Sequence, residues 1–188
     1  MNPSDFLRRE IIRPFVTLVV PGGIALTPYV LLLIRERRDV GTFVVSNSGT
    51  AALLVLFGAI AAGLILEDIG SWIESRLWDK KLAKKDKAHF ETWREYLKLK
   101  FQVEPIGQSY IRSILLRMKF ELGFGLALMV TLPGTISLGW QLGLPLWPHL
   151  TLIFVLTLAI GGYLLHESYD SAHTLSRVRK LLVAASGE

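Results

Sequence analysis

Acidic and histidine residues collect where long apolar segments end, and together they could do chemistry. Glu67 and Asp68 follow one apolar segment directly, and Glu121 precedes another. His166, Asp170 and His173 follow a third at spacing i, i+4, i+7, which places them on one face of a helix. The candidate catalytic cluster consists of Glu67, Asp68, Glu121, His166, Glu167, Asp170 and His173.

Carboxylates and imidazoles that project from neighbouring helices can bind a divalent ion, which would activate water against a lipid headgroup or a peptide. The candidate metal ligands are Glu67, Glu74, His166, Asp170 and His173. Two simpler interpretations compete with this one. The polar residues could form a cluster that braces the helix ends. Alternatively, they are unconnected charges at the first solvated turn of each helix.

The sequence lacks the motifs that identify well-known classes of enzyme. It contains no Walker loop, no H-E-x-x-H, no G-x-S-x-G and no dinucleotide fingerprint. Cysteine is absent, which excludes disulfides and thiolate chemistry. No cofactor is therefore predicted, and a divalent metal remains the alternative.

Four apolar runs must position these polar residues, and their length predicts a membrane protein. They cover residues 14–34, 50–66, 122–140 and 148–165, and none contains an Asp, Glu, Lys or Arg. At 1.5 Å per residue they measure roughly 25–31 Å, which matches a hydrocarbon core of about 30 Å. A bilayer offers backbone groups no partner, so these runs are expected to be helices.

The predicted fold class is an all-α polytopic membrane protein with two transmembrane hairpins and an amphipathic cytosolic segment between them. Four parts follow from the positions of the runs. They are the N-terminal tail and first hairpin (1–66), a basic helical segment (67–120), the second hairpin (121–165) and an amphipathic tail (166–188).

The distribution of Lys and Arg predicts the orientation. Three precede the first run, twelve lie between Glu67 and Phe120, and three lie in the C-terminal tail. The connection 141–147 has none. Because basic residues stay on the cytosolic side, both termini and the central segment are expected in the cytosol of a cell-membrane protein. Arg35, Arg37 and Arg38 oppose this assignment.

Aromatic and helix-breaking residues add detail to this topology. Amphipathic aromatics favour the membrane interface, so four tryptophans are expected to anchor the protein there: Trp72, Trp93, Trp140 and Trp147. Two Pro-Gly pairs lie inside spans and are expected to kink them: Pro21, Gly22, Pro133 and Gly134. Ordinary close packing of small residues is the alternative explanation for these pairs.

The central segment contains three amphipathic patterns. One combines Ile69, Trp72, Ile73 and Leu77; the second combines Phe90, Trp93, Leu97 and Phe101; the third combines Ile111, Ile114, Leu115 and Met118. The tail adds Leu175, Val178 and Leu182 on one side. Since the aromatics of the second pattern share one helical face, we expect that face to be buried. An exposed platform for nucleic-acid bases is accordingly disfavoured.

These observations favour a non-enzymatic role. The predicted function is a membrane anchor, sensor or effector subunit that acts through its basic cytosolic helices and self-associates. The expected partners are the bilayer with its anionic headgroups and either a second copy or another protein on the cytosolic side. The alternative is an interfacial membrane enzyme that uses the acidic and histidine cluster on lipid or peptide.

Overall fold

The computed structural model describes residues 13–99, 106–143 and 146–186. Every regular element in these ranges is helical, which confirms the all-α class. The elements are α2 (Arg13–Glu36), α3 (Arg38–Ser46), α4 (Ser48–Ile73), the π-helical turn η2 (Glu74–Trp78), α5 (Asp79–Lys85), α6 (His89–Lys98), α7 (Ile106–Gln141) and α8 (Leu146–Ser186).

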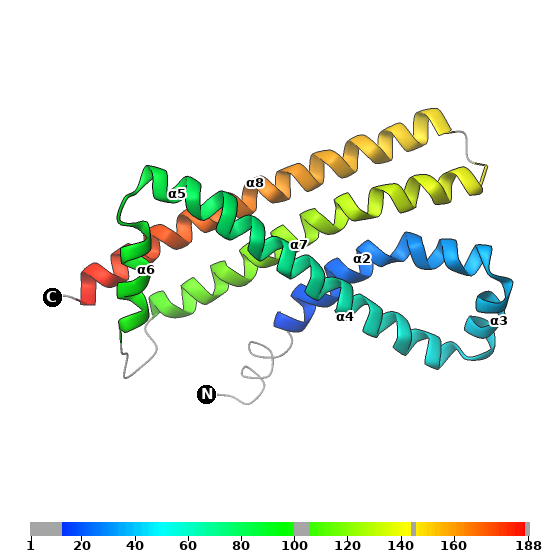
Figure 1. Ribbon diagram of the computed structural model, residues 1–188, viewed down its shortest axis with the longest axis horizontal. Helices are drawn as coiled ribbons and strands as arrows, with labels where there is room; N and C mark the ends of the chain where they lie inside the picture. The colour runs from blue at the N-terminus through cyan, green and yellow to red at the C-terminus, as the bar shows by residue number, and fades with distance from the viewer. Residues whose placement is uncertain (1–12, 100–105, 144–145, 187–188) are drawn as a thin grey trace.

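The helices form an elongated molecule (Figure 1). Helices α7 and α8 run side by side, and α2 packs against both α4 and α7. One end carries α3, the last turn of α7 and the first turn of α8, and the opposite end carries α5, α6 and the last turns of α8. Helix α6 lies across the long axis of the molecule rather than along it.

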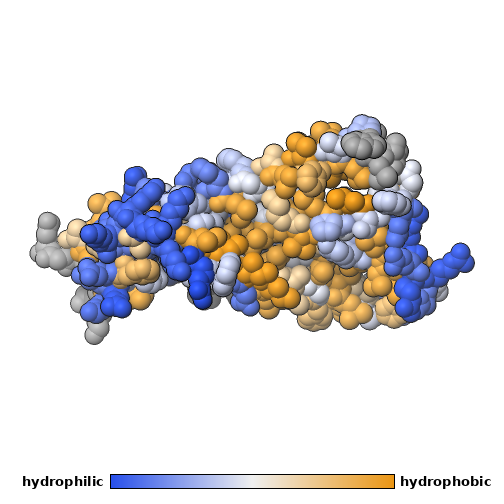
Figure 2. Space-filling view, turned by 45° about the horizontal axis from the view of Figure 1, so that its top comes forward, coloured by the Kyte–Doolittle hydropathy of each residue, from blue (hydrophilic) through white to orange (hydrophobic). Residues whose placement is uncertain are grey.

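Four of the described helices are long and apolar enough to cross a membrane, as predicted: α2, α4, α7 and α8. Figure 2 shows apolar surface between two hydrophilic ends. Large apolar side chains are exposed there, including Phe57 at 65%, Leu152 at 57% and Val155 at 54%. Such an apolar band would be unfavourable in water and is the expected surface of a protein in lipid.

Three of these helices continue well beyond the apolar band. Helix α4 passes through η2 into α5 without a break, so residues 48–85 form a single helical segment. Its 38 residues measure about 57 Å, nearly twice the thickness of a hydrocarbon core. The amphipathic pattern of Ile69, Trp72, Ile73 and Leu77, which follows the second run directly, lies on α4 and its continuation η2. No proline interrupts this segment.

The extensions pack together with α6 into a unit that we call the head, residues 67–99, 106–121 and 166–186. Its core contains Met118 at 0% exposure, Leu82 at 4% and Ala172 at 5%, with Trp78 beside them. A second cluster joins Ile111, Ile114 and Leu175. The apolar faces predicted in 111–118 and 175–182 are thus confirmed as core.

The predicted burial of the aromatic face of α6 is wrong. Phe90 is 50% exposed, Leu97 65% and Trp93 38%. The buried side chains of this helix are His89 and Thr92, which turn toward the head. The reason is that α6 packs against the head through the side of the helix that carries His89, Thr92 and Tyr96, so Phe90 and Leu97 point outward. Phe101, the last member of the predicted face, lies outside the described residues.

At the end away from the head, polar contacts join α2 to α7. Arg35 Nη2 donates to the Gln141 carbonyl at 2.5 Å, and Gln141 Nε2 donates to Glu36 at 2.7 Å. A cation favours the C-terminal end of a helix, where carbonyl groups are unpaired. Arg35 therefore has a structural role on the side where basic residues are not expected. Gly143, with φ of 64°, ends α7 just beyond.

Candidate functional site

The acids of the candidate cluster meet basic residues of α7. Lys119 Nζ lies 2.6 Å from a Glu67 oxygen, which joins α7 to α4. Arg117 Nε lies 2.6 Å from Glu121, and the same guanidinium also pairs with Glu167 of α8. Where they leave the apolar band, α4, α7 and α8 are therefore connected by Arg117 and Lys119, two basic residues that the sequence did not single out.

Glu121 is the most enclosed member of the cluster. It is 6% exposed, and its second carboxylate oxygen accepts a hydrogen bond of 3.1 Å from Ser171. One turn away, Ser168 donates to the Met118 carbonyl at 2.9 Å. A buried carboxylate needs partners for its lone pairs, and here Arg117 and Ser171 supply them. These contacts join α7 to α8 where both helices leave the apolar band.

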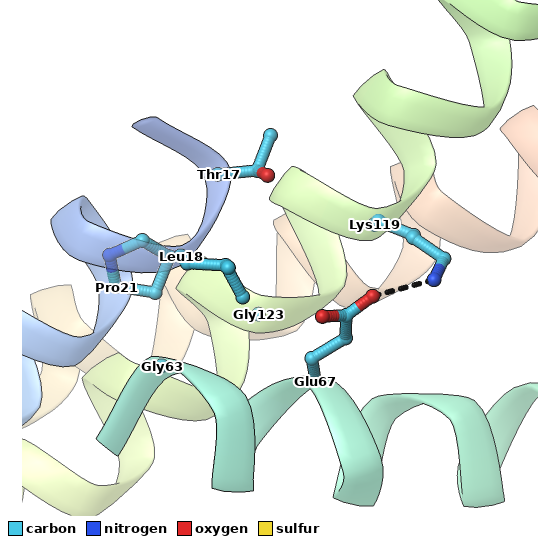
Figure 3. Close-up of a pocket in the computed structure, with 7 residues that line it drawn as sticks. All are labelled: Thr17, Leu18, Pro21, Gly63, Glu67, Lys119 and Gly123. Atoms are coloured by element: carbon cyan, nitrogen blue, oxygen red, sulfur yellow. Dashed lines mark hydrogen bonds and ion pairs between the residues drawn. The ribbon is translucent and has the colours of Figure 1, made fainter. Parts of the chain in front are cut away.

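The pair Glu67–Lys119 lines two small clefts, one between α2, α4 and α7 and the other between the α4–η2 segment and α7. Figure 3 shows Glu67 reaching from α4 toward Lys119, with Thr17 and Pro21 of α2 opposite. The cleft holds about 20 Å³, and an adjoining cleft with Ser71 and Glu74 holds about 10 Å³. Such volumes fit a water molecule rather than a lipid headgroup or a peptide.

The candidate metal ligands do not gather around one point. Within the described residues, no three His, Asp or Glu side chains are arranged to hold a metal ion. His166 and Asp170 lie 3.5 Å apart on the surface, 73% and 57% exposed. Asp68 is exposed, and His173 is half-buried. The geometry thus gives Glu67, Glu121 and Glu167 basic partners instead of a shared ligand.

A second polar network connects α5, α6 and α8 in the head. His89 Nδ1 lies 3.1 Å from Ser176 Oγ, and His89 Nε2 lies 3.3 Å from Asp79. Serine, histidine and aspartate in series are the components of a hydrolytic triad. Ser176 is only 7% exposed on a packed helix face, which leaves no room for a substrate carbonyl. The network therefore holds α6 against its neighbours.

Arg179 adds a cation to the same contact between α6 and α8. It is 6% exposed, and its guanidinium lies 4.3 Å from the centre of the Trp93 ring. Trp93 stacks in turn on Tyr96 at 5.9 Å. Glu74 and Asp79 are close enough for their charges to act on Arg179. A cation over an aromatic face is favourable, and the acids partly offset the cost of its burial.

At the edge of the head, Lys180 of α8 pairs with Asp86 in the connection between α5 and α6. The hydrogen bond from Lys180 holds the pKa of the Asp86 carboxyl below its usual range. Lys81 and Lys85 lie over the Tyr169 ring at 4.4 and 5.9 Å. The connection between α5 and α6 is thereby held to α8 by charge.

The predicted interface anchors lie in different surroundings. Trp72 is 58% exposed on α4, and Trp140 is 72% exposed near the end of α7. Trp93 lies on α6 against Arg179, at the far side of the head. The side chain of Trp147 lies outside the described residues. The structure therefore separates Trp93 from the two tryptophans at the edges of the apolar band.

The most important residues missed from the sequence are the partners of the acids and of Asp79. Arg117 precedes Glu121 by four residues, and this spacing indicates a pair within α7. Lys119 pairs instead with Glu67, 52 residues away on α4. His89 and Ser176 are separated by 87 residues. No local pattern reveals a contact of that kind.

Comparisons with known proteins found no match. No protein-family model matches the sequence, and neither curated proteins nor solved structures gave a match. The four candidate spans fit a multi-pass membrane protein.

Proposed function

We propose that this multi-pass membrane protein acts without catalysis, as an anchored scaffold whose head self-associates through α6. The observation that carries this proposal is the outer face of α6. It exposes Phe90 and Leu97 together with two acids and two bases, Glu91, Arg94, Glu95 and Lys98. The alternative enzymatic role is less well supported, because Glu67, Glu121 and Glu167 are held in ion pairs.

In this proposal the head lies in the cytosol. Helices α2 and α4 form one transmembrane hairpin, and α7 and α8 form the other. The support is the distribution of charge, since twelve Lys and Arg residues lie in the central segment between Glu67 and Phe120, among them Arg76, Lys80 and Lys84 of η2 and α5. Arg35 is an exception to the rule that basic residues stay in the cytosol. Its structural role offers a reason for this exception, because Arg35 binds a backbone carbonyl of α7.

The membrane that holds the spans is too distant to cover α6. Helix α6 contacts Ser176 and Arg179 of α8, which follow Leu165 by 11 and 14 residues. These residues lie roughly 16 and 21 Å beyond the apolar run. The headgroup layer adds only about 5–8 Å on each side. A protein surface is therefore the suitable partner for Phe90 and Leu97.

The charges of α6 favour a second copy of the same helix. Glu91 and Lys98 are seven residues apart, about two turns, so they lie on the same side of the helix. Two α6 helices that run antiparallel would bring Glu91 of each copy beside Lys98 of the other. The same arrangement sets Phe90 of one copy near Leu97 of the other. The face is thus complementary to itself.

The membrane imposes the orientation that this pairing needs. Two copies in one bilayer point the same way and are related by a two-fold axis along the membrane normal. Because α6 lies across the long axis of the molecule (Figure 1), such an axis makes the paired helices antiparallel. A ten-residue helix buries only a small interface area when it pairs with a second copy. Confinement to the membrane raises the effective concentration of the second copy.

Crosslinking in membranes tests the pairing directly. The chain has no cysteine, so Arg94→Cys provides one thiol next to the proposed two-fold axis. We expect a short bifunctional thiol reagent to convert most of this variant to a dimer. Leu181→Cys, 70% exposed on α8, is the control and should remain monomeric.

Exchange of the paired charges tests the register. Glu91→Lys and Lys98→Glu should each lower the crosslinked fraction about fivefold, because like charges then face each other. The double exchange should restore it. A monomeric wild-type protein in native membranes would overturn the proposal. So would a double exchange that stays as weak as either single variant, or a crosslink to a different protein in place of the second copy.

A further inference from the structure

We infer that a groove between α2 and α7 binds one acyl chain of a phospholipid in the leaflet away from the head. The groove has a volume of about 330 Å³, and both helices contribute side chains to its lining. The inference rests on the spans alone and does not depend on pairing through α6. It is argued from the depth of the groove, from the contacts at its two ends and from the chemistry of its lining.

The groove covers the depth of one leaflet. Its lining extends from Ile24 to Leu31 on α2 and from Thr131 to Leu138 on α7. Ile24 and Thr131 are the middle residues of the first and third apolar runs, and Leu31 and Leu138 lie within three residues of the ends of these runs. Seven residues of helix measure roughly 10 Å, and one leaflet of the hydrocarbon core measures about 15 Å. An acyl chain occupies the same range, from the headgroups to the middle of the bilayer.

Hydrogen bonds join α2 to α7 at both ends of the groove. At the middle of the bilayer, Thr131 Oγ1 donates to the Ile24 carbonyl at 3.0 Å. Pro28 has no N–H and cannot supply the helical hydrogen bond to that carbonyl, so the threonine replaces it. At the other end, one turn beyond the lining, Arg35 Nη2 donates to the Gln141 carbonyl at 2.5 Å. Because both ends are fixed, the groove is formed before a ligand enters it, which favours binding.

The lining suits a hydrocarbon ligand. None of the described residues that line the groove is charged. Thr27 donates to the Gly23 carbonyl at 2.7 Å, and Thr135 donates to the Thr131 carbonyl at 3.0 Å. Together with Thr131, all three threonines of the lining thus direct their hydroxyl protons to backbone carbonyls. A polar ligand would lose its partners in water and find no donor here.

A lipid chain fits this groove better than a membrane-spanning helix of a second copy. Over its length of roughly 10 Å, the volume of 330 Å³ gives a cross-section of about 30 Å², less than half that of a helix about 10 Å in diameter. A spanning helix would also continue past the middle of the bilayer, where the contact between Thr131 and Ile24 ends the groove. Thr27 and Leu31 are exposed, so the chain of a neighbouring lipid can enter sideways without leaving its leaflet.

Photochemical labelling tests the inference on the wild-type protein. The protein is placed in nanodiscs whose phosphatidylcholine carries a diazirine in the middle of one acyl chain. Dilution into excess detergent exchanges the lipids at ordinary exposed surfaces, illumination follows, and peptide mass spectrometry locates the attached lipid. We expect about fivefold more label on residues 24–31 and 131–138 than on residues 152–156 of α8. This segment is the internal reference, because its side chains are exposed at a similar depth.

Two phenylalanine variants separate the groove from the rest of the lipid-exposed surface. Thr27→Phe places a ring in the groove and should reduce the label there to the level of α8. Val155→Phe adds bulk at the same depth on α8 and should leave the label in the groove unchanged. The Thr27 hydroxyl bonds within its own helix, so its loss leaves the contacts between α2 and α7 in place. Circular dichroism confirms that both variants are folded.

The wild-type measurement is sufficient to overturn the inference. Equal labelling of the groove and of α8 would do so, as would a folded Thr27→Phe variant that is labelled like the wild type. Thr135→Cys examines the other occupant, because the chain has no cysteine of its own. A disulfide between two copies at this position, formed in the membrane, would assign the groove to a second copy instead.

Discussion

The helices of the membrane-spanning bundle and those of the head are held together by different kinds of contact. Between α2 and α4, backbones meet directly: a Cβ on Gly22 would lie 1.9 Å from the Ala59 carbonyl oxygen. A Cβ on Gly63 would lie 2.2 Å from the Leu18 carbonyl oxygen. In the head, large side chains such as Trp78 and Met118 fill the space between helices, and ion pairs surround them.

The difference follows from the surroundings of the helices, which are water in the head and lipid in the bundle. Water drives apolar side chains together in the head, so a side-chain core is stabilising there. Lipid chains are as apolar as leucine and supply no such drive, so spans associate by close packing of small residues. This explains the Pro-Gly pairs. Helices α2 and α7 continue through Pro21 and Pro133, and Gly134 lies against Pro28.

Polar groups show the same contrast. In the bundle, hydroxyl groups bond to backbone carbonyls: Thr131 donates to Ile24 at 3.0 Å, and Tyr29 donates to Val130 at 2.7 Å. Neither of these two contacts involves a charged side chain. In the head, side-chain charges bind each other, as in Arg117–Glu121 and Lys119–Glu67. The change from one kind to the other occurs where the apolar band ends.

Gly63→Ala should give the largest loss of stability, because the new methyl group must push α2 away from α4. We expect it to cost about 3 kcal/mol, the upper part of the usual range for overpacking. Unfolding of the purified protein in mixed detergent micelles, followed by circular dichroism, measures the change.

Gly162→Ala is the matched control, because no atom lies within 4 Å of the position of its Cβ. It should be neutral or stabilise α8 by up to about 1 kcal/mol. If the two alanine variants unfold alike, the close contact between α2 and α4 does not hold the bundle together.

Glu121→Ala tests the charged side of the comparison. The change leaves the buried Ser171 hydroxyl without its acceptor and removes one partner of Arg117, so we expect a loss of about 2 kcal/mol. The same unfolding measurement applies, with tryptophan fluorescence as a second signal for the head.

Asp170→Ala is the control for Glu121→Ala, since the pair His166–Asp170 is exposed. Exposed pairs contribute little, so a change within about 0.5 kcal/mol is expected. A stability loss as large as that of Glu121→Ala would show that burial does not distinguish the two acids. In the enzymatic alternative, Asp170→Ala would instead abolish activity without affecting assembly.

The sequence was informative where one physical rule dominated. The run 14–34 agrees closely with α2 (Arg13–Glu36), because a charge-free apolar run of that length has one stable form in lipid. The face containing Ile111, Ile114 and Met118 was recognised correctly, because helical periodicity places these side chains on one side of α7 and that side packs inside the head.

The pattern was insufficient where burial depended on partners distant in the chain. The apolar face of α6 suggested burial, yet His89 contacts Ser176 and Asp79 and turns that face outward. The acids at the ends of the spans suggested a metal or catalytic site, whereas the structure shows Lys119 paired with Glu67 and Arg117 bridging Glu121 and Glu167. In each case a hydrogen bond or ion pair between helices decided the outcome.

The smallest effect is expected from Asp86 and Asp39, two acids at opposite ends of the molecule. The pKa of Asp86 is lowered by its hydrogen bond from Lys180, and that of Asp39 by its hydrogen bonds from Arg37. A lowered pKa means that each pair stabilises the fold above the ordinary aspartate pKa of about 4. The contribution is lost as the pH falls through the lower, folded value.

The two acids differ in what their partners connect, and this difference gives the last prediction. Asp86 and Lys180 are 94 residues apart and join the α5–α6 connection to α8, whereas Arg37 and Asp39 are two residues apart. The local pair can form in the unfolded chain as well, so its loss changes the free energy of unfolding less.

Asp86→Asn should therefore lower stability at neutral pH more than Asp39→Asn does. The difference between Asp86→Asn and wild type should vanish once the pH falls below the lowered pKa of Asp86 in the folded protein. Unfolding curves of the three proteins across this pH range measure it, and a difference that persists in acid would mean that Asp86 acts through something other than its charge.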